Sequence, residues 1–434
     1  MKALWNQMQD LHPKFAAINR CLEQDWFLLH YELRLQRAHA KTLREADVYT
    51  SEEHARILCA LDRLEKDFSG EPCPESAAED LHTWMELQLK DLAGEAGCKI
   101  HTARSRNDQV ATLLKMYLIE KGGVHVADFG RLIETGCRRA KDWSDLAFPL
   151  QTHCQFAAPG NVGFWVLSYM TALSRVRRHL RYLVSDWRRS CPLGSGAVAG
   201  SSIAIDRQVQ AAQLGFGAPS LNALESTSCR DECLELLALL AQTALHLQSF
   251  ATDVIMFSQT PLNWTVYPGE FATGSSMMPN KTNPDAMELL RGECNAVLSA
   301  HQQAVMILKG LPRGYNRDLQ CIKPVIRHAV ETMHTISTLT ECFLGALEFN
   351  SEQLFASLEL GHINATLHME SKVKDGMALR DAHHAVAKDL SRSAMPTDIA
   401  TDRYETQGSA NPVETRRVAD ELLTVLKSEG GRED

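Results

Sequence analysis

Four polar segments, far apart in the chain, carry side chains that could bind an anion or move a proton. One of them, TGSSMMPNKTNP at residues 273–284, places a serine, a lysine and an asparagine among a glycine and two prolines. In another, Arg104, Arg106 and Asn107 come just before an apolar-periodic run. A helix that starts there, with Asp108 or Asn107 as its cap, adds positive potential to the arginines. This segment therefore predicts a receptor for a carboxylate.

The other two segments supply a proton-transfer group and more cations. His153 follows Thr152 in a stretch bounded by two prolines. An imidazole exchanges protons near neutral pH, and a neighbouring hydroxyl can hold a ligand oxygen. Tyr315, Gln320 and Lys323 belong to an expected helix start that also carries an arginine. Because arginine binds carboxylates in bidentate fashion and lysine acts as a point charge, this mixture suits a ligand with more than one acid group.

Taken singly, each segment also has a plain structural interpretation. The glycine- and proline-rich stretch could be a connector whose lysine points into water, and the arginine segment could be an ordinary charged turn. The histidine could be structural, and the tyrosine segment a solvated helix end. The combination favours a binding site, because all four segments adjoin long helical patterns in a chain that otherwise needs few loops. Active sites are commonly assembled from such dispersed segments.

Long helical patterns must position these segments. Residues 14–69 contain neither glycine nor proline, and the capping box TSEE at residues 50–53 divides this stretch into two expected helices. Residues 164–191 and 220–260 are likewise free of both helix breakers. No strand cluster is evident, since strands would show period-two alternation and frequent turn residues. Helices longer than the mean of about 11–12 residues predict an elongated all-α bundle that finds partners in other subunits.

Glycine and proline concentrate at a few places, and the chain between them suggests three parts. We predict an N-terminal helical domain at residues 1–103, a central long-helix bundle domain at 104–350 that carries the loop 273–284, and a small C-terminal helical domain at 351–434. No internal repeat and no low-complexity tract is visible. The fold class is therefore all-α, with an elongated central bundle flanked by two smaller helical domains.

The composition argues against several classes of protein. The 434 residues are 44% hydrophobic, which is enough for a sizeable core. A net charge of -9 argues against a nucleic-acid or membrane-surface binder, because anionic surfaces reward clustered lysine and arginine. Twelve cysteines without a CxxC pair, and no apolar signal segment, indicate the cytoplasm. The most apolar run, from Leu234, is interrupted before the roughly 20 residues that a membrane span needs.

Three of these motifs, in order, resemble a known family. TGSSMMPNKTNPD resembles the signature loop of the fumarase/aspartase superfamily, and HTARSRNDQVAT with KGLPRGYNRDLQ resembles its argininosuccinate lyase branch. The resemblance covers most of the chain and includes PLGSGAVAG at residues 192–200 and LRDAHH at 379–384. It implies an all-α homotetramer in which each active site draws residues from three subunits. The implied reaction cleaves argininosuccinate to arginine and fumarate without a metal or an organic cofactor.

The resemblance also implies roles for individual residues. Ser275 and His153 are the catalytic pair, and either could be the base. Lys281, Asn283 and Thr152 would hold the aci-carboxylate intermediate, whose double negative charge needs preorganised donors where water is excluded. A serine base needs a lowered pKa, for which Lys281 and the loop amides supply a physical cause. The loop would then be a lid that delivers Ser275 when it closes.

Further substrate contacts follow from the same match, and so do departures from the family pattern. The contacts fall on Asn107, Thr152, Tyr315, Gln320 and Lys323, with Arg106 and His82 at the anionic end. A family serine that touches the amino-acid end of the substrate aligns with Cys21. Other departures are LWNQ at residues 4–7, TWM after His82, and QTHCQFAAP from Gln151. They lie mainly where the leaving group is recognised, so they leave the identity of the amine open.

Competing functions remain to be weighed. A dinucleotide enzyme would use Gly194, Gly196 and Gly200, but this glycine set lacks a preceding strand and a βαβ context. A metalloenzyme could be built on His383 and His384, yet no HExxH or Cys/His spacing accompanies them. Two alternatives on the same fold stay open: a lyase that releases fumarate from another N-substituted succinate, and a non-catalytic structural homologue.

Overall fold

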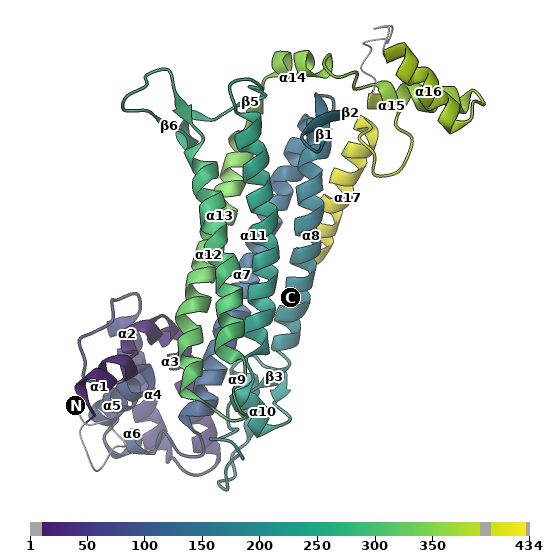
Figure 1. The fold of residues 1–434 in the computed structure, drawn as a ribbon. Coiled ribbons are helices and arrows are strands. Elements are labelled where there is room, and N and C mark those ends of the chain that lie inside the picture. Colours follow the sequence, from purple (N-terminus) through teal and green to yellow (C-terminus); the bar gives the residue numbers. More distant parts are fainter. Residues whose placement is uncertain (1–10, 391–400, 431–434) are drawn as a thin grey trace. The chain divides into compact units, whose positions relative to one another are not determined.

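The computed structural model describes residues 11–390 and 401–430, and these fold mostly as helices (Figure 1). The predicted all-α class is therefore confirmed. The segment at residues 4–7, which departs from the family pattern, lies outside the described residues.

The chain divides into two compact units. Of the described residues, unit 1 holds those up to 124 together with 180–238 and 299–330, and unit 2 holds 125–179, 239–298 and those from 331 onward. Some long helices contribute residues to both units: α7 (Arg106–Asp142), α8 (Val162–Trp187), α11 (Asp231–Phe257), α12 (Asp285–Leu308) and α13 (Ile322–Ala346). The three-domain division with boundaries at 103/104 and 350/351 stays a prediction.

Helices of up to 18 residues form the N-terminal part of unit 1. They are α1 (Pro13–Asn19), α2 (Leu22–Asp25), η1 (Trp26–Leu28), α3 (Leu29–Glu45), α4 (Ser51–Phe68), α5 (Leu81–Ala93) and α6 (Glu95–Lys99). The capping box before α4 is confirmed, because the Thr50 hydroxyl accepts from the Glu53 amide at 3.2 Å and the Glu53 carboxylate from the Thr50 amide at 2.9 Å.

The expectation of only two helices in residues 14–69 is wrong. The chain leaves the helical path at Arg20, whose backbone is extended, and the amide of Cys21 donates to the carbonyl oxygen of Glu79 at 2.7 Å. This contact with a residue far along the chain replaces a helical hydrogen bond at the break. Local composition contains no signal of it.

The rest of unit 1 includes the glycine-rich loop at residues 192–200. Around it lie β3 (Ser190–Cys191), which pairs in parallel with β4 (Ala218–Pro219), and the helices α9 (Arg207–Gln213) and α10 (Ala223–Ser228). The segment η3 (Arg317–Cys321) leads into α13. The amides of Gly194 and Gly196 in this loop reach Asp108 near the start of α7, where two of the expected site residues lie.

Unit 2 carries short antiparallel strand pairs that the helical patterns did not indicate. They are β1 (Ala147–Thr152) with β2 (Gln155–Asn161), β5 (Thr265–Val266) with β8 (Glu348–Phe349), and β6 (Thr273–Gly274) with β7 (Thr282–Asn283). The expectation of no strand cluster is therefore too strict. Pairs of two residues show no alternation, and β1 and β2 contain prolines that normally argue against a strand.

Helices complete unit 2 after α13. They are α14 (Ser351–Leu358), α15 (Ala365–Lys374), α16 (Leu379–Leu390) and α17 (Pro412–Gly430), with the short η2 (Gly269–Phe271) and η4 (Thr401–Arg403). In α11, Leu240, Leu247, Phe250 and Val254 are buried at helical spacing, as its sequence predicts.

An aromatic cluster fixes the base of the β1–β2 hairpin in unit 2. Phe148 of β1 packs edge-on against Trp264 at a centroid distance of 5.4 Å and against Phe257 at 5.3 Å. Both Phe148 and Trp264 are buried. Aromatic packing of this kind adds to the stabilisation from buried area. The base of the hairpin is therefore held firmly in the core of unit 2.

One helix of the described residues, α11, is long and apolar enough to cross a membrane by composition alone. Half of its most apolar 18-residue window is buried within the protein. The core helix of a folded protein has the same character, and the polar Gln242, Thr243 and His246 interrupt the run.

Candidate active site

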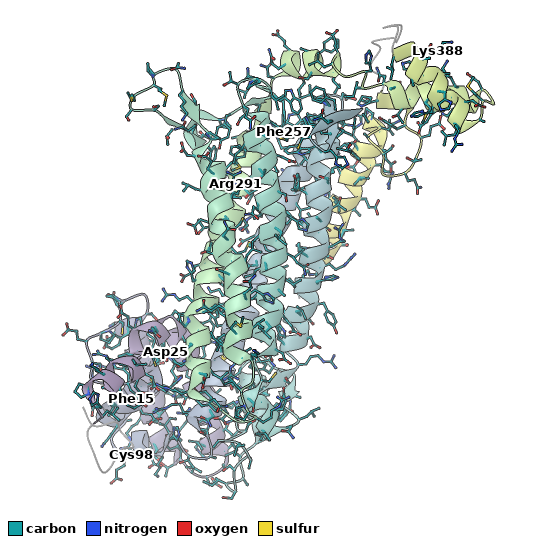
Figure 2. All side chains as sticks on the ribbon, viewed as in Figure 1. Phe15, Asp25, Cys98, Phe257, Arg291 and Lys388 are labelled. Carbon is teal, nitrogen blue, oxygen red and sulfur yellow. The ribbon has the colours of Figure 1, made fainter. Side chains whose placement is uncertain are left out.

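A buried carboxylate in unit 1 gathers three of the expected site residues. Asp25, at the end of α2, is fully buried, and its Oδ1 accepts from Lys323 Nζ and from Gln320 Nε2, both at 2.9 Å. The Cys21 thiol lies 3.6 Å from Asp25 Oδ2. The position of Asp25 can be seen in Figure 2. The structure thus brings Cys21, Gln320 and Lys323 together around an acid that the sequence interpretation missed.

The thiol of this cluster is a neutral donor. Cys21 is buried, and burial together with the neighbouring Asp25 carboxylate raises the pKa of the Cys21 thiol to about 12. The Arg317 guanidinium donates to the Asn19 carbonyl oxygen at 2.9 Å and lies 3.8 Å from the Cys21 sulfur. Burial opposes the charge of Arg317, but Cys21 and, after it, Tyr315 raise the pKa of Arg317. The expected substrate residues of the tyrosine segment therefore share one polar neighbourhood with Cys21.

A cavity of about 710 Å³ opens beside this cluster. Its lining includes Cys21 itself, the aromatic side chains of Trp26 and Phe27, and the charged side chains of Arg20 and Glu23. The lining mixes aromatic and charged side chains, and a concave site with convergent polar groups is a candidate for binding a small molecule. Cys21 belongs both to the lining of the cavity and to the Asp25 cluster.

Arg106 is held by acidic neighbours. Its guanidinium donates to Glu79 Oε1 at 2.5 Å and to Thr83 Oγ1 at 2.9 Å, and lies 3.2 Å from Asp80 Oδ2. Burial opposes the charge, but Asp80 and Glu79 outweigh it and raise the pKa of Arg106. The guanidinium therefore stays charged, and two carboxylates of the same chain already occupy part of its hydrogen-bonding capacity.

His82 lies deeper in unit 1. Its Nδ1 is 3.1 Å from Glu32 Oε2, and both side chains are buried. Burial alone would raise the pKa of Glu32, but the contact with His82, the charge of Arg104 and the donor Gln36 lower it. The pair fixes the orientation of the His82 ring.

The cap of α7 is Ser105, and the prediction of Asn107 or Asp108 in that position is wrong. The Asn107 amide donates to Ser105 Oγ at 3.3 Å, and the Ser105 amide donates to Asp108 Oδ1 at 2.9 Å. Because α7 begins at Arg106, Asn107 and Asp108 fall inside its first turn. The Asn107 side chain instead donates from Nδ2 to the Ala197 carbonyl oxygen at 3.1 Å.

In unit 2, His153 occupies the tip of the β1–β2 hairpin. Thr152 pairs with Gln155, so His153 and Cys154 alone form the turn, with φ of 55° and 57°. Two consecutive positive φ values are the geometry of the tight hairpin turn that glycine and asparagine favour. Two other residue types hold it here, which is a strained arrangement of the kind that clusters at functional sites. The hydroxyl of Thr152 and the imidazole of His153 are both exposed.

The signature loop is a second hairpin in unit 2, closed by β6 and β7. Ser275 Oγ accepts from the amides of Met277 at 3.3 Å and Met278 at 3.0 Å. At the base of the loop, the Thr273 amide donates to the Asp285 carboxylate at 3.1 Å. The amide pair stabilises negative charge on Ser275 Oγ, which supports the expected effect of the loop amides on the serine hydroxyl.

Lys281 and Asn283 follow in the same loop. The Lys281 amide donates to the Met278 carbonyl oxygen at 3.1 Å, while its side chain is exposed. Asn283 lies in β7, opposite Thr273 in β6. The loop therefore presents a hydroxyl, an ammonium group and an amide from one short turn.

The expected residues thus fall into separate groups. Among the described residues, no hydrogen bond or ion pair joins His153 to Ser275, and the β1–β2 and β6–β7 hairpins of unit 2 stand apart in Figure 1. No cluster of three or more potential metal ligands occurs in the described part of the chain. Neither hairpin by itself contains both residues of the predicted catalytic pair.

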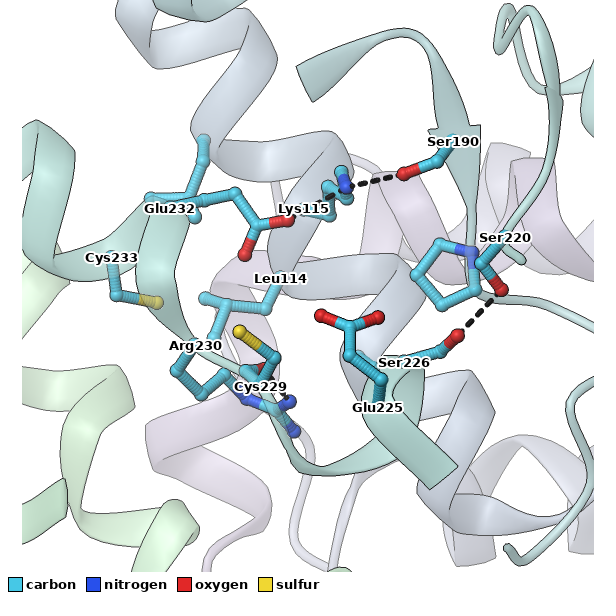
Figure 3. A pocket seen from close by; sticks show the side chains of 13 residues that line it. Leu114, Lys115, Ser190, Ser220, Glu225, Ser226, Cys229, Arg230, Glu232 and Cys233 are labelled. Carbon is cyan, nitrogen blue, oxygen red and sulfur yellow. Dashed lines mark hydrogen bonds and ion pairs between the residues drawn. The ribbon is translucent and has the colours of Figure 1, made fainter. Parts of the chain in front are cut away.

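A smaller cavity of about 60 Å³ lies elsewhere in unit 1 and was not indicated by the sequence (Figure 3). Lys115 crosses it, with its Nζ 2.7 Å from Glu232 Oε1 and 3.1 Å from Ser190 Oγ. The buried Arg230 also lines it and donates to the Cys229 carbonyl oxygen at 2.5 Å. The cavity is polar and small, and its lysine is already paired.

Comparison with known proteins decides the family. A model of a lyase family matches residues 10–299. An argininosuccinate lyase of Koribacter versatilis (strain Ellin345) is 36% identical over 382 residues, which cover 87% of this chain and 81% of the relative. This chain belongs to the argininosuccinate lyase family. A second relative, from Acidobacterium capsulatum, is also 36% identical, over 91% of this chain and 83% of its own.

Solved structures share the fold with this member of the argininosuccinate lyase family. EDDS lyase in complex with formate superposes with a TM-score of 0.81 at 21% identity, over 98% of this chain and 92% of that one. A variant of EDDS lyase with bound fumarate superposes equally well. At this level of identity the match establishes the fold alone.

Proposed function

We propose that this protein cleaves argininosuccinate to L-arginine and fumarate by anti β-elimination. The observation that carries the proposal is the signature loop of a chain of the argininosuccinate lyase family. In this loop two backbone amides hold Ser275 Oγ, and the same loop carries Lys281 and Asn283. The substrate is a small anion, and the site has cations and amide donors to receive it.

The first requirement is stabilisation of charge. Removing a proton beside a carboxylate creates an aci-carboxylate with two negative charges, which needs preorganised donors in a site without water. We assign this task to Lys281, Asn283 and Thr152. Lys281 supplies the positive charge, and the other two supply an amide and a hydroxyl whose positions their strands fix.

The second requirement is a base and an acid on opposite faces of the substrate. Ser275 and His153 take these two roles. The amides of Met277 and Met278 favour the alkoxide form of Ser275, which supports Ser275 as the base. His153, exposed at a rigid hairpin tip, then delivers the proton to the departing nitrogen. Neither step requires a metal or an organic cofactor.

The third requirement is recognition of the amine. The Asp25 cluster offers a buried carboxylate, a thiol donor at Cys21, and the side chains of Gln320 and Lys323. Such a mixture of acceptor and donors suits the amino-acid end of arginine. Asn107 and Tyr315 complete this side of the site, whereas Arg106 and His82 belong to its anionic end as contacts or supports.

The groups must come together through assembly. Since Ser275 and His153 lie on separate hairpins of one chain, we propose a homotetramer in which three subunits contribute to each active site, working in the cytoplasm in arginine biosynthesis. Sedimentation should give four times the chain mass of 48.4 kDa. Mixing inactive Ser275→Ala and His153→Asn chains should then restore part of the activity, because some sites receive both intact residues. A monomer with full activity would refute the shared site.

The test of the reaction follows the absorbance of fumarate during incubation with argininosuccinate. Ser275→Ala should abolish turnover, whereas the control Ser276→Ala, an exposed neighbour, should retain it. His153→Asn should lower the rate by about 10²–10⁴-fold, the usual effect of losing a positioned proton-transfer group. Turnover of a different N-substituted succinate alone would identify a related lyase. Inactivity on all such substrates would identify a structural homologue.

A further inference from the structure

A single buried carboxylate fastens the glycine-rich loop at residues 192–200 to the start of α7. Asp108 is fully buried, and its Oδ2 accepts from the amides of Gly194 at 2.9 Å and Gly196 at 2.8 Å. Its Oδ1 accepts from the Ser105 amide at 2.9 Å. Hydrogen bonds to a charged acceptor are stronger than neutral ones, so three amides from two segments are held by one side chain.

The loop is built so that its backbone can reach Asp108. Gly196 has φ of 63°, and a Cβ added there would lie 2.4 Å from the Gly200 carbonyl oxygen. Gly194 has φ of 82°, and its Cβ would lie 2.8 Å from the Gln210 side chain. Only glycine fits such close approaches at positive φ. The glycines that resembled a dinucleotide fingerprint therefore serve to aim two amides at a carboxylate of the same unit.

A second side chain holds the loop from its other face. Arg207 Nε donates to the Leu193 carbonyl oxygen at 3.0 Å, and its Nη2 donates to Ser195 Oγ at 3.0 Å. Leu193 and Ser195 are both buried, whereas the loop is exposed from Ala197 onward. The loop is thus anchored at its buried half and presents the carbonyl of Ala197 at the surface.

The exposed half of the loop holds the side chain of Asn107. Asn107 Nδ2 donates to the Ala197 carbonyl oxygen at 3.1 Å. This bond uses the donor end of the amide and leaves its oxygen to accept from outside. Asn107 and Asp108 are adjacent in α7 and contact the same loop. Asp108 holds the buried half of the loop, and the exposed half of the loop holds the side chain of Asn107.

We propose that Asp108 is a positioning residue for substrate binding: by clamping the loop 192–200 it places the Ala197 carbonyl so that the Asn107 amide presents its oxygen to an N–H group of the substrate. This inference rests on the proposed function, in which Asn107 contacts the substrate. It assigns Asn107 to the nitrogen-bearing end of the ligand and gives the glycine-rich loop a task in binding.

The charge state of Asp108 links the clamp to pH. Burial raises the pKa of Asp108 to about 6, although its three amide donors and Arg104 oppose this. Arg207 and the buried Cys191 thiol are the other titratable groups that face it. Above pH 6 the carboxylate accepts all three amides, and protonation below pH 6 weakens them. KM should therefore rise as the pH falls through about 6.

The decisive variant is Asp108→Asn, which keeps the shape and removes the charge and one acceptor oxygen. We expect KM for argininosuccinate to rise at least about tenfold, which corresponds to about 1.4 kcal/mol, while kcat changes less than about threefold. The rise of KM below pH 6 should disappear. The matched control is Asp206→Asn, an exposed carboxylate that caps α9 through the amides of Gln208 and Val209 in the same unit. It should leave KM unchanged.

Two further measurements separate positioning from general stability. In an Asn107→Ala background, Asp108→Asn should change KM by less than about twofold, because two residues that act through one contact are not additive. Hydrogen exchange of the peptide spanning 192–200 should be faster in Asp108→Asn and normal in Asp206→Asn. If Asp108→Asn fails to fold, Gly196→Ala moves the loop while keeping the carboxylate and should raise KM equally.

The outcomes that overturn the inference differ from those that overturn the proposed function. With an active wild-type enzyme, an unchanged KM, additive effects in the double variant or unchanged loop exchange would refute the positioning role. If the unmodified chain turns over no argininosuccinate, the proposed function itself fails. Loop exchange would still report whether Asp108 holds the loop.

Discussion

Replacing Lys323 by methionine tests whether the Asp25 cluster is held as tightly as the structure indicates. The change removes the ammonium group and keeps a side chain of similar length. Lys323 and Asp25 have 1% and 0% of their side-chain surface exposed, and the atoms that pair are 2.9 Å apart. The substitution therefore leaves a carboxylate in the interior with two neutral donors, Gln320 and the Cys21 thiol, and without its cation.

The magnitude follows from burial and distance. At 2.9 Å and an effective dielectric constant of about 20, the attraction between two unit charges is roughly 6 kcal/mol. Desolvation of both groups offsets much of this in the intact pair. Once one partner is removed the other remains desolvated and unpaired, and such single removals cost about 3–5 kcal/mol. We expect Lys323→Met to lower the free energy of unfolding by that amount.

The assay is urea unfolding at a fixed protein concentration, followed by circular dichroism. Lys374→Met is the control, since Lys374 Nζ lies 2.7 Å from Glu405 Oε1 but both side chains are largely exposed, at 61% and 76%. An exposed pair contributes about 0–1 kcal/mol. The double variant Asp25→Asn with Lys323→Met should be more stable than Lys323→Met alone, because it removes the orphaned charge.

The reasoning would be refuted by either of two results. One is a cost for Lys323→Met as small as that for Lys374→Met. The other is a double variant less stable than the single one, which would show that the carboxylate is useful without its lysine. Loss of activity alone would not discriminate, since both residues belong to the proposed site.

Cys21 should react with iodoacetamide at least about tenfold more slowly than the exposed Cys98, because the buried thiol stays protonated; timed labelling read by mass spectrometry would contradict this if the two rates were equal. Gly97→Ala should destabilise by about 1–3 kcal/mol, since its Cβ would lie 2.2 Å from a backbone carbonyl oxygen. Gly123→Ala, in open space within α7, should instead stabilise by about 0.5–1 kcal/mol in urea unfolding. Burial would raise the pKa of Asp128, but contacts with two histidines lower it to about 2. The contribution of Asp128 to the free energy of unfolding is therefore complete above its unfolded-state pKa of 3.8 and is lost as the pH falls towards 2. Asp128→Asn should flatten that loss in acid unfolding curves.

The sequence alone predicts the elements whose causes are local. The absence of glycine and proline predicts the long helices α8 and α11, and the capping box at residues 50–53 predicts the start of α4. Each of these depends on residues within a few positions of one another. The signature loop and the other family motifs indicate the family for the same reason, because each of them consists of contiguous residues.

The structure alone decides which distant residues meet. The two hairpins escaped prediction because β6 and β7 are two residues long and the strain at His153 depends on the register of β1 and β2. The cap of α7 is Ser105, whose amide donates to one carboxylate oxygen of Asp108, while the other oxygen accepts from Gly194 in the loop at 192–200. Neither outcome has a local pattern.

Asp25 shows the physical reason most clearly. In the sequence it is one acid among many, in a short helix beside Cys21. Its importance arises from a lysine 298 positions away that is buried against it at 2.9 Å. Helical periodicity records which face of an element is apolar, but not which partner covers that face. Pairing across such a separation is decided by packing, and only the tertiary structure contains it.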